Sequence, residues 1–172
     1  MLSWYAIYTN PRAEKRAHAE LISKGIEAYL PLQRTLKQWS DRKKWVEEPL
    51  FRSYIFVNID NSRYFDVLNT PGIVRYVTFE GKAVPIPPKQ IDAIKYFLSG
   101  QELLQEESNI SHLVPGSPVE IIRGPLRGLS GVLVDFQGQK KVRVEIEALG
   151  QFLNLSIALQ DLRSTLSTNS HK

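Results

Sequence analysis

The chain has 172 residues, of which 42% are hydrophobic and 10% aromatic, and its 22 Lys and Arg against 18 Asp and Glu leave a formal charge of +4. It contains no cysteine, which excludes a disulfide framework, a thiolate nucleophile and a zinc site with cysteine ligands, and which is typical of a reducing compartment. The first residues carry no basic leader before an apolar run, and no stretch approaches the roughly 20 apolar residues of a membrane span, so we expect a cytoplasmic protein without a membrane partner.

The charge is distributed unevenly along the chain. Residues 1–100 hold 15 basic and 10 acidic side chains, residues 101–112 hold 0 and 3, and residues 113–172 hold 7 and 5, which gives +5, −3 and +2. Strong nonspecific binding to duplex nucleic acid needs many phosphate contacts from Lys or Arg. We therefore expect any nucleic-acid contact to be local and to be assisted by another partner.

The chain opens with a predicted strand and a basic helix. Residues 4–9 are aromatic and β-branched, and Asn10-Pro11 reads as an N-cap followed by a proline at the first helical position. The pattern predicts a helix from Pro11 to about Lys24, whose apolar stripe lies opposite a basic face of Arg12, Lys15 and Arg16. A solvated surface and a phosphate-contacting face are both open interpretations of these residues.

After a short predicted strand over residues 26–30, the sequence becomes polar and basic as far as Pro49. Two tryptophans stand among five basic residues: Trp39 and Trp45 with Arg34, Lys37, Arg42, Lys43 and Lys44. The pattern fits a β-hairpin or a mobile loop. Basic and aromatic residues together suit a surface that follows a single strand or a phosphate backbone, but two tryptophans in a hairpin pack against each other at least as often.

The strongest predicted strand covers residues 51–59. Its alternation places Ile55, Val57 and Ile59 on one face. Tyr54 and Phe56 occupy the other face, where a half-buried strand would carry polar residues. The strand is therefore either covered on both faces or exposes an aromatic patch for a partner.

A short helix over residues 61–68, a strand over 73–79 and a helix from Pro87-Pro88 to about Gly100 complete the first predicted domain. The order strand, helix, strand, hairpin, strand, helix, strand, helix predicts an α+β domain over residues 1–100, with helices flanking a mainly antiparallel sheet.

Residues 113–164 predict a second domain, a small all-β barrel. The acidic and polar residues 101–112 read as a linker, and short strands with glycines at the corners follow them. Within this domain we expect Val142, Val144 and Ile146 to face inward. Residues 165–172 have little to bury and are expected to be a disordered tail.

Nothing in the sequence supports catalysis. The three histidines, His18, His112 and His171, fall on a helix, in the linker and in the tail, so they suggest neither a metal site nor a triad. The glycine-rich run GPLRGLSG lacks the endings of a P-loop and of a dinucleotide-binding turn. We expect a noncatalytic monomer that needs no metal or cofactor.

Three segments in order make the chain similar to the NusG family of transcription elongation factors. The family's first strand and helix resemble WYAIYTNPRAEKRAHAEL, its central strand resembles EPLFRSYIFVNID, and the KOW motif of its SH3-like C-terminal barrel resembles VEIIRGPLRGLSGVLVDF, which contains Gly124, Gly128 and Gly131. The resemblance covers residues 4 to about 163. It implies a factor that binds RNA polymerase, bridges its cleft and suppresses pausing.

The resemblance also implies interaction sites. Family members bind the clamp helices of the largest polymerase subunit through an apolar patch, which is matched by Tyr54 and Phe56, with Tyr8 and Ile94 as neighbours. The basic residues Arg12, Lys15 and Arg16 match a region close to exposed nontemplate DNA, and direct DNA contact stays open. The family's barrel recruits termination factor Rho or the small-subunit ribosomal protein NusE, which points to Ile157 and Leu159 near the barrel edge.

Two departures distinguish the chain from housekeeping members. They read FPGY where this chain has Phe51-Arg52-Ser53-Tyr54, and they carry phenylalanines where it has Leu126 and Leu129. The sequence therefore resembles the specialised RfaH-like and UpxY-like antiterminators more closely, and predicts an antiterminator. The alternatives are a housekeeping NusG that assists Rho-dependent termination and an RNA-binding, ribosome-associated KOW protein.

Overall fold

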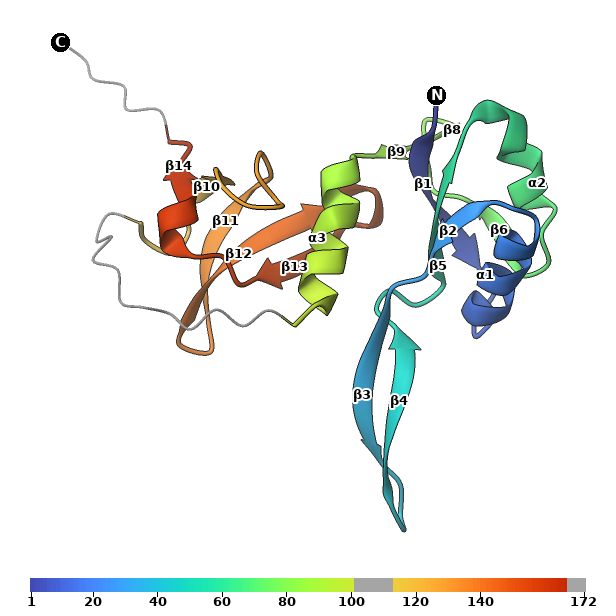
Figure 1. Ribbon diagram of the computed structural model, residues 1–172, viewed down its shortest axis with the longest axis horizontal. Coiled ribbons are helices and arrows are strands. Elements are labelled where there is room, and N and C mark those ends of the chain that lie inside the picture. The colour runs from blue at the N-terminus through green and yellow to red at the C-terminus, as the bar shows by residue number, and fades with distance from the viewer. Residues whose placement is uncertain (101–112, 167–172) are drawn as a thin grey trace. The chain divides into compact units, whose positions relative to one another are not determined.

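The computed structural model describes residues 1–100 and 113–166, and its contacts divide the chain into two units, Met1–Pro87 and Pro88–Lys172. The predicted linker over residues 101–112, with His112, and residues 167–172 of the predicted tail, with His171, lie outside the described residues. Each unit is built on its own sheet (Figure 1).

The first unit contains an antiparallel sheet whose strands follow the order β2 (Glu27–Tyr29), β5 (Tyr54–Ile59), β1 (Ser3–Thr9) and β6 (Ile73–Tyr76). The short strand β9 (Pro85–Ile86) also pairs with β1. All of these pairs are antiparallel, which confirms the predicted sheet type. The predicted strand over 73–79 is divided, because β7 (Thr78–Phe79) leaves this sheet and pairs with β8 (Lys82–Ala83).

One face of this sheet carries the hydrophobic core of the first unit. The helices α1 (Glu14–Ser23) and α2 (Tyr64–Leu68) both contribute to that core, through Ala17 and Leu21 and through Val67. The sheet contributes alternate residues, among them Ile7 of β1 and the three strand residues Ile55, Val57 and Ile59 that the sequence pattern places on one face. Since both helices serve one face, the opposite face of β1 and β5 presents a separate set of side chains.

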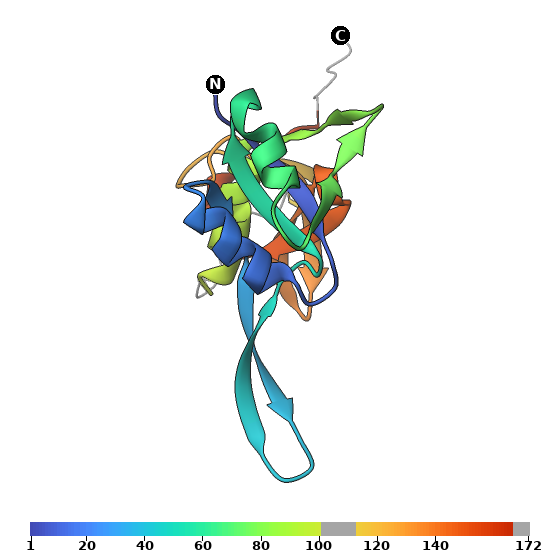
Figure 2. The same ribbon diagram turned by 90° about the vertical axis from the view of Figure 1, so that its right-hand side faces the viewer.

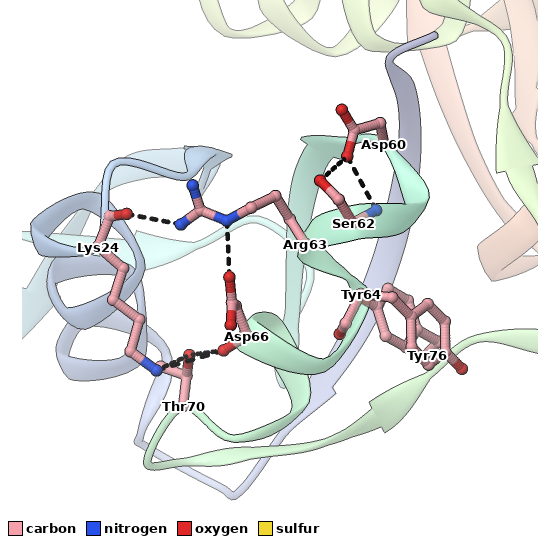
Figure 3. A network of polar contacts seen from close by, with 8 residues as sticks. All are labelled: Lys24, Asp60, Ser62, Arg63, Tyr64, Asp66, Thr70 and Tyr76. Carbon is pink, nitrogen blue, oxygen red and sulfur yellow. Dashed lines mark hydrogen bonds and ion pairs between the residues drawn. The ribbon is translucent and has the colours of Figure 1, made fainter.

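A polar network joins the two helices at their ends (Figure 3). The Arg63 guanidinium donates to the Lys24 carbonyl oxygen at 2.6 Å and forms an ion pair with Asp66 at 2.8 Å. The Lys24 ammonium in turn donates to the Asp66 carbonyl and to the Thr70 hydroxyl. Asp60 accepts from the Ser62 backbone N–H and so caps the short helix η1 (Asn61–Arg63). Its carboxylate also accepts from the Ser62 hydroxyl, and this bond, followed by the one from the backbone N–H, lowers the pKa of the Asp60 carboxyl.

The first helix begins three residues later than predicted. Asn10 and Pro11 form a turn closed by a hydrogen bond from the Ala13 N–H to the Asn10 carbonyl, and Arg12 has a φ of 63°. Residues 10–13 therefore form a β-turn, with proline at the second position and a positive φ at the third, and not a helix N-cap. Arg12 therefore precedes α1, and Lys15 and Arg16 remain on it.

The basic stretch after residue 31 is a two-stranded hairpin, formed by β3 (Leu32–Gln38) and β4 (Lys43–Pro49). Figure 2 shows it as a long arm that extends away from the sheet of the first unit. The chain reverses over Ser40 and Asp41, because the Trp39 and Arg42 backbones hydrogen bond to each other. Of the two open possibilities, hairpin and mobile loop, the structure has the hairpin.

The second unit combines helix α3 (Pro88–Leu98) with a five-stranded antiparallel sheet. The order of its strands is β13 (Gln151–Leu155), β12 (Gln139–Ile146), β11 (Ser130–Phe136), β10 (Pro118–Ile121) and β14 (Leu162–Ser164). Two single helical turns, η2 (Glu147–Leu149) and η3 (Leu159–Asp161), connect them. Val142, Val144 and Ile146 are buried, as predicted from their alternation.

Helix α3 groups with this sheet, which differs from the predicted first domain of residues 1–100. It lies against β12 and β13, and two hydrogen bonds fix it there. The Tyr96 hydroxyl donates to the Ser156 carbonyl at 2.7 Å, and the Gln90 side-chain oxygen accepts from the Glu147 N–H at 3.2 Å. The amphipathic pattern predicts the helix but does not say which sheet receives its apolar face.

Candidate functional site

The face of the first sheet opposite the helices carries an aromatic stripe. Tyr8 of β1 is directly paired with Tyr54 of β5, and their ring centroids are 4.8 Å apart. Arg75 of β6 is the neighbour of Tyr8 on the other side, and its guanidinium carbon lies 4.9 Å from the centre of the Tyr8 ring. Both tyrosines are half-buried and Arg75 is exposed. We call these three residues the tyrosine patch.

The tyrosine patch is electrostatically unusual at Tyr54. Burial, followed by a hydrogen bond and electrostatic interaction with Tyr8, raises the pKa of Tyr54 to about 12. The Tyr54 hydroxyl is therefore neutral at physiological pH, and the patch carries the positive charge of Arg75 beside it. Rings with a polar tip, accessible at one side, are typical of protein interfaces.

Phe56 is not an exposed member of this patch, which corrects the interpretation of its face as an exposed aromatic surface. Its side chain is 0% exposed. It is paired with Ala6 of β1 and Tyr29 of β2, and its ring lies 6.1 Å from that of Phe51 and 6.4 Å from that of Tyr29. The alternation correctly places Phe56 on the face of Tyr54, but strand periodicity does not reveal how deeply a residue is covered.

Ile94, the fourth residue of the predicted apolar patch, belongs to the second unit and is 0% exposed on α3. The structure thus brings together Tyr8, Tyr54 and Phe56 on one sheet face. Arg75 was missed by the sequence reasoning. Its place could have been found from strand pairing, since the residue opposite Tyr8 shares its face.

The three predicted basic residues are exposed but do not form a single helix face. Arg12 lies in the turn before α1, while Arg16 lines a shallow hollow with Asn10, Ala13, Pro71 and Gly72. The Lys15 ammonium donates to the Glu47 carbonyl oxygen at 2.9 Å, which ties α1 to the base of the hairpin. Two of the three cations therefore remain available for an anionic partner near the same helix end.

The glycines of the GPLRGLSG motif in the second unit allow backbone conformations and a close strand approach that a side chain would hinder. Gly124 and Gly128 have φ values of 84° and 93°, and the Gly128 N–H donates to the Ile121 carbonyl, so both residues shape a tight connection between β10 and β11. A side chain at Gly131 would place its Cβ 2.5 Å from the Arg143 carbonyl oxygen. Leu126 and Leu129, in the same segment, are buried.

The predicted partner residues of the second unit, Ile157 and Leu159, are half-buried. Both follow the edge strand β13. Ile157 comes directly after Ser156, whose carbonyl accepts from the Tyr96 hydroxyl, and Leu159 is the first residue of η3. Among residues 1–100 and 113–166, His, Asp and Glu form no group of three that could hold a metal ion. None of the helices in the same ranges is long and apolar enough to cross a membrane.

Comparisons with known proteins agree with this architecture. The family model described as "Transcription termination factor nusG" matches residues 2–95. A structure described as "Domain interaction in Thermotoga maritima NusG" is similar with a TM-score of 0.56 at 19% identity, over 96% of this chain and 98% of that chain.

A second solved structure, the MjSpt4:Spt5 complex in conformation A, matches with a TM-score of 0.34 at 14% identity, over 94% of this chain and 96% of that chain. The likeness of fold thus rests on the Thermotoga protein, and the family assignment on the match to more than half of the chain. This chain belongs to the NusG family.

Proposed function

We propose that this protein is a noncatalytic transcription elongation factor that acts as an antiterminator. Family membership supports a role in transcription. The observation that carries the proposal is the tyrosine patch, a half-buried pair of rings beside Arg75 on the sheet face that α1 and α2 leave to other contacts. Its partner is RNA polymerase, through the clamp helices of the largest subunit.

Tyr8 and Tyr54 provide the accessible part of this polymerase-binding surface, and the buried Phe56 supports them from the same sheet face. Ile94 is not part of this proposed surface, because it is fully buried in the second unit. The Tyr54 hydroxyl is neutral at physiological pH, so binding combines apolar contact with hydrogen bonding. Aromatic residues of this kind often dominate interface energies.

Arg12 and Arg16 provide a contact with nontemplate DNA in the elongation complex, and Lys15 holds the neighbouring hairpin in place. These few cations give a local contact that needs polymerase as an anchor, because each phosphate contact adds only a modest electrostatic attraction.

The second unit acts as a KOW barrel that recruits a second partner through Ile157 and Leu159, either NusE or Rho. Two sequence differences favour a specialised RfaH-like or UpxY-like role. Ser53 stands where housekeeping members have glycine, and Leu126 and Leu129, which replace their phenylalanines, are buried. We infer a monomeric cytoplasmic factor that uses no cofactor.

A housekeeping role in Rho-dependent termination is the second candidate, favoured by the description of the matching family model as a termination factor. Transcription with purified polymerase, on a template that carries a pause site and a Rho-dependent terminator, separates the two. Increased readthrough supports the antiterminator, and increased termination in the presence of Rho supports the alternative.

The same assay tests the site. Tyr54→Ala should abolish the effect, whereas Phe79→Ala should not, because Phe79 is 72% exposed on β7 and lies outside the tyrosine patch. Strong RNA binding without capture of polymerase would contradict both transcription roles and indicate the ribosome-associated KOW protein.

A further inference from the structure

The hairpin of β3 and β4 concentrates positive charge. The hairpin, residues 32–49, holds five basic residues, Arg34, Lys37, Arg42, Lys43 and Lys44, against three acidic ones, Asp41, Glu47 and Glu48, which gives +2. Glu47 and Glu48 lie at its base, so residues 34–44 carry +4. Lys37 forms an ion pair with Glu48. Within the described parts of the chain, the other four basic residues of the segment form no ion pair with a carboxylate, which leaves them available for an anion.

The same hairpin exposes two tryptophans. Trp39 is 46% exposed and Trp45 is 57% exposed. The register pairs Leu36 with Trp45, and the backbone pairing of Trp39 with Arg42 continues the ladder, so alternation places the two rings on opposite faces of the ribbon. The two rings therefore do not pack on each other. Mutual packing, the usual structural reason for two tryptophans in one hairpin, does not account for them here.

Each tryptophan instead has an arginine beside it. The guanidinium carbon of Arg34 lies 5.4 Å from the centre of the Trp45 ring, and that of Arg42 lies 5.3 Å from the centre of the Trp39 ring. Such cation–π contacts hold a flat ring and a positive charge side by side at the surface. Each face of the ribbon therefore offers one base-stacking platform with a phosphate-binding group next to it.

This arrangement suits a polynucleotide without base pairs. A ribbon of two strands can enter the major groove of a duplex, but stacked base pairs leave no free base face for an exposed indole ring. A single strand offers both an unstacked base for each ring and a phosphate for each cation. Stacking and phosphate contacts read no base edges, so the recognition does not depend on sequence.

We propose that the hairpin is an arm that binds single-stranded nucleic acid, through stacking on Trp39 and Trp45 and phosphate contacts with Arg34, Arg42, Lys43 and Lys44. Lys15 supports the arm at its base by its hydrogen bond to the Glu47 carbonyl. The proposal uses residues outside the tyrosine patch and does not depend on binding of polymerase.

The test measures fluorescence anisotropy of labelled oligonucleotides of about 20 nucleotides, long enough to span such a surface, with the full-length protein at low salt. The probes are oligo-dT, oligo-U and a duplex of equal length. Either single strand should bind more tightly than the duplex, and the tighter of the two identifies DNA or RNA as the ligand. Tighter binding of the duplex would overturn the proposal.

Variants then locate the contact. Trp45→Ala should weaken binding of the single strand about fivefold or more, while Trp45→Phe, which retains a ring, should lose less. Phe79→Ala is the matched aromatic control and should change nothing. Trp45 is exposed, so the Ala variant should keep the circular dichroism spectrum and the melting temperature of the parent. If Trp45→Ala unfolds, the test rests on Trp45→Phe, whose binding to the single strands and to the duplex is compared with that of the parent.

The charges are tested by the salt dependence. Replacing Arg42, Lys43 and Lys44 by glutamine should reduce the slope of log K against log salt by about 2, because each phosphate contact on a single strand contributes roughly 0.7. The control replaces three exposed basic residues elsewhere, Lys82, Arg123 and Arg127, by glutamine. An equal loss in both variants would indicate nonspecific attraction and overturn the arm. Unchanged oligonucleotide binding in the hairpin variant, with loss of polymerase capture, would instead make the arm a protein contact.

Discussion

The Glu14 carboxylate accepts a hydrogen bond from the Ser53 backbone N–H at 2.9 Å, and this contact joins α1 to the turn that leads into β5. Glu14 is buried, with 7% of its surface exposed, and Ser53 has a φ of 64°. The bond therefore fixes both the start of the helix and the strand that carries Tyr54. It places the tyrosine patch through residues that do not belong to it.

Glu14→Ala should lower the free energy of unfolding of the first unit by about 1–3 kcal/mol, because it leaves a covered N–H without an acceptor. Trp4, Trp39 and Trp45 all lie in this unit, so urea denaturation followed by tryptophan fluorescence reports on it. Glu14→Gln keeps an acceptor oxygen and should lose less. Equal losses in the two variants would show that the hydrogen bond is not the cause.

Ser53→Gly should instead stabilise the first unit, by up to about 1 kcal/mol. A positive φ strains a residue that has a Cβ, whereas glycine adopts it without this cost. The substitution keeps the N–H that Glu14 accepts, and it restores the glycine of the FPGY sequence found in housekeeping relatives. Denaturation under the same conditions is the measurement, and a loss of stability would mean that the serine side chain makes a contact of its own.

The sequence predicts the helices and strands better than it predicts which residues they bury and which elements they pack against. Alternation gave the buried set of Ile55 and Val57, and the pattern of α3 gave the helix, because both depend on local periodicity. The prediction that Asn10-Pro11 starts the helix is wrong, because an Asn-Pro pair is common both at a helix start and in a turn. The positive φ of Arg12 shows that the pair forms a turn here. Burial of Phe56 and the placement of α3 depend on contacts between segments distant in sequence, which a local pattern does not contain.

The pKa of Tyr54 provides a test of the tyrosine patch by pH. An unfolded tyrosine ionises near pH 10 and Tyr54 near about 12, so folding favours its neutral form. The stability that this gives is fully present below about pH 10 and is lost as the pH rises through about 12. The difference in tyrosinate absorbance between the parent and Tyr54→Phe should have its midpoint at about pH 12, while the circular dichroism spectrum remains that of the folded protein.

In a Tyr8→Phe background the pKa of Tyr54 should fall part of the way toward its usual value, because burial still raises it while the hydrogen bond and the electrostatic interaction with Tyr8 are removed. A midpoint near pH 10 in the parent protein would contradict both the burial of Tyr54 and its pairing with Tyr8.

Gly131→Ala should destabilise the second unit by about 1–3 kcal/mol, because the new Cβ would lie 2.5 Å from the Arg143 carbonyl oxygen and 2.8 Å from the Val142 side chain. The contact is with backbone, so β11 and β12 would have to separate. Amide hydrogen exchange along β12 should increase, whereas Ser130→Ala, at the exposed neighbouring position, should leave it unchanged. Unchanged exchange in the glycine variant would show that the two strands can shift at little cost.

Tyr54 and Phe56 share one strand face but differ in burial. Substitution of Phe56 should therefore reduce mainly the stability of the protein, and substitution of Tyr54 mainly its binding of polymerase. Phe56→Ala removes a fully buried ring and should lower the free energy of unfolding by roughly 3–5 kcal/mol. Tyr54→Ala removes a half-buried ring and should instead cost about 2 kcal/mol or more of polymerase binding, roughly a thirtyfold loss of affinity, if the tyrosine patch is an interface hot spot.

Both quantities should be measured for both variants, by denaturation and by titration of core polymerase, with the exposed Phe79→Ala as the control that changes neither by more than about 0.5 kcal/mol. Phe56 is buried and contacts no partner itself, so its variant should lose polymerase binding only in proportion to its unfolded fraction. A stable Phe56→Ala protein would contradict the burial argument. A Tyr54→Ala protein that binds polymerase with the parent's affinity would remove the tyrosine patch from the interface and leave the polymerase contact to other residues of the first unit.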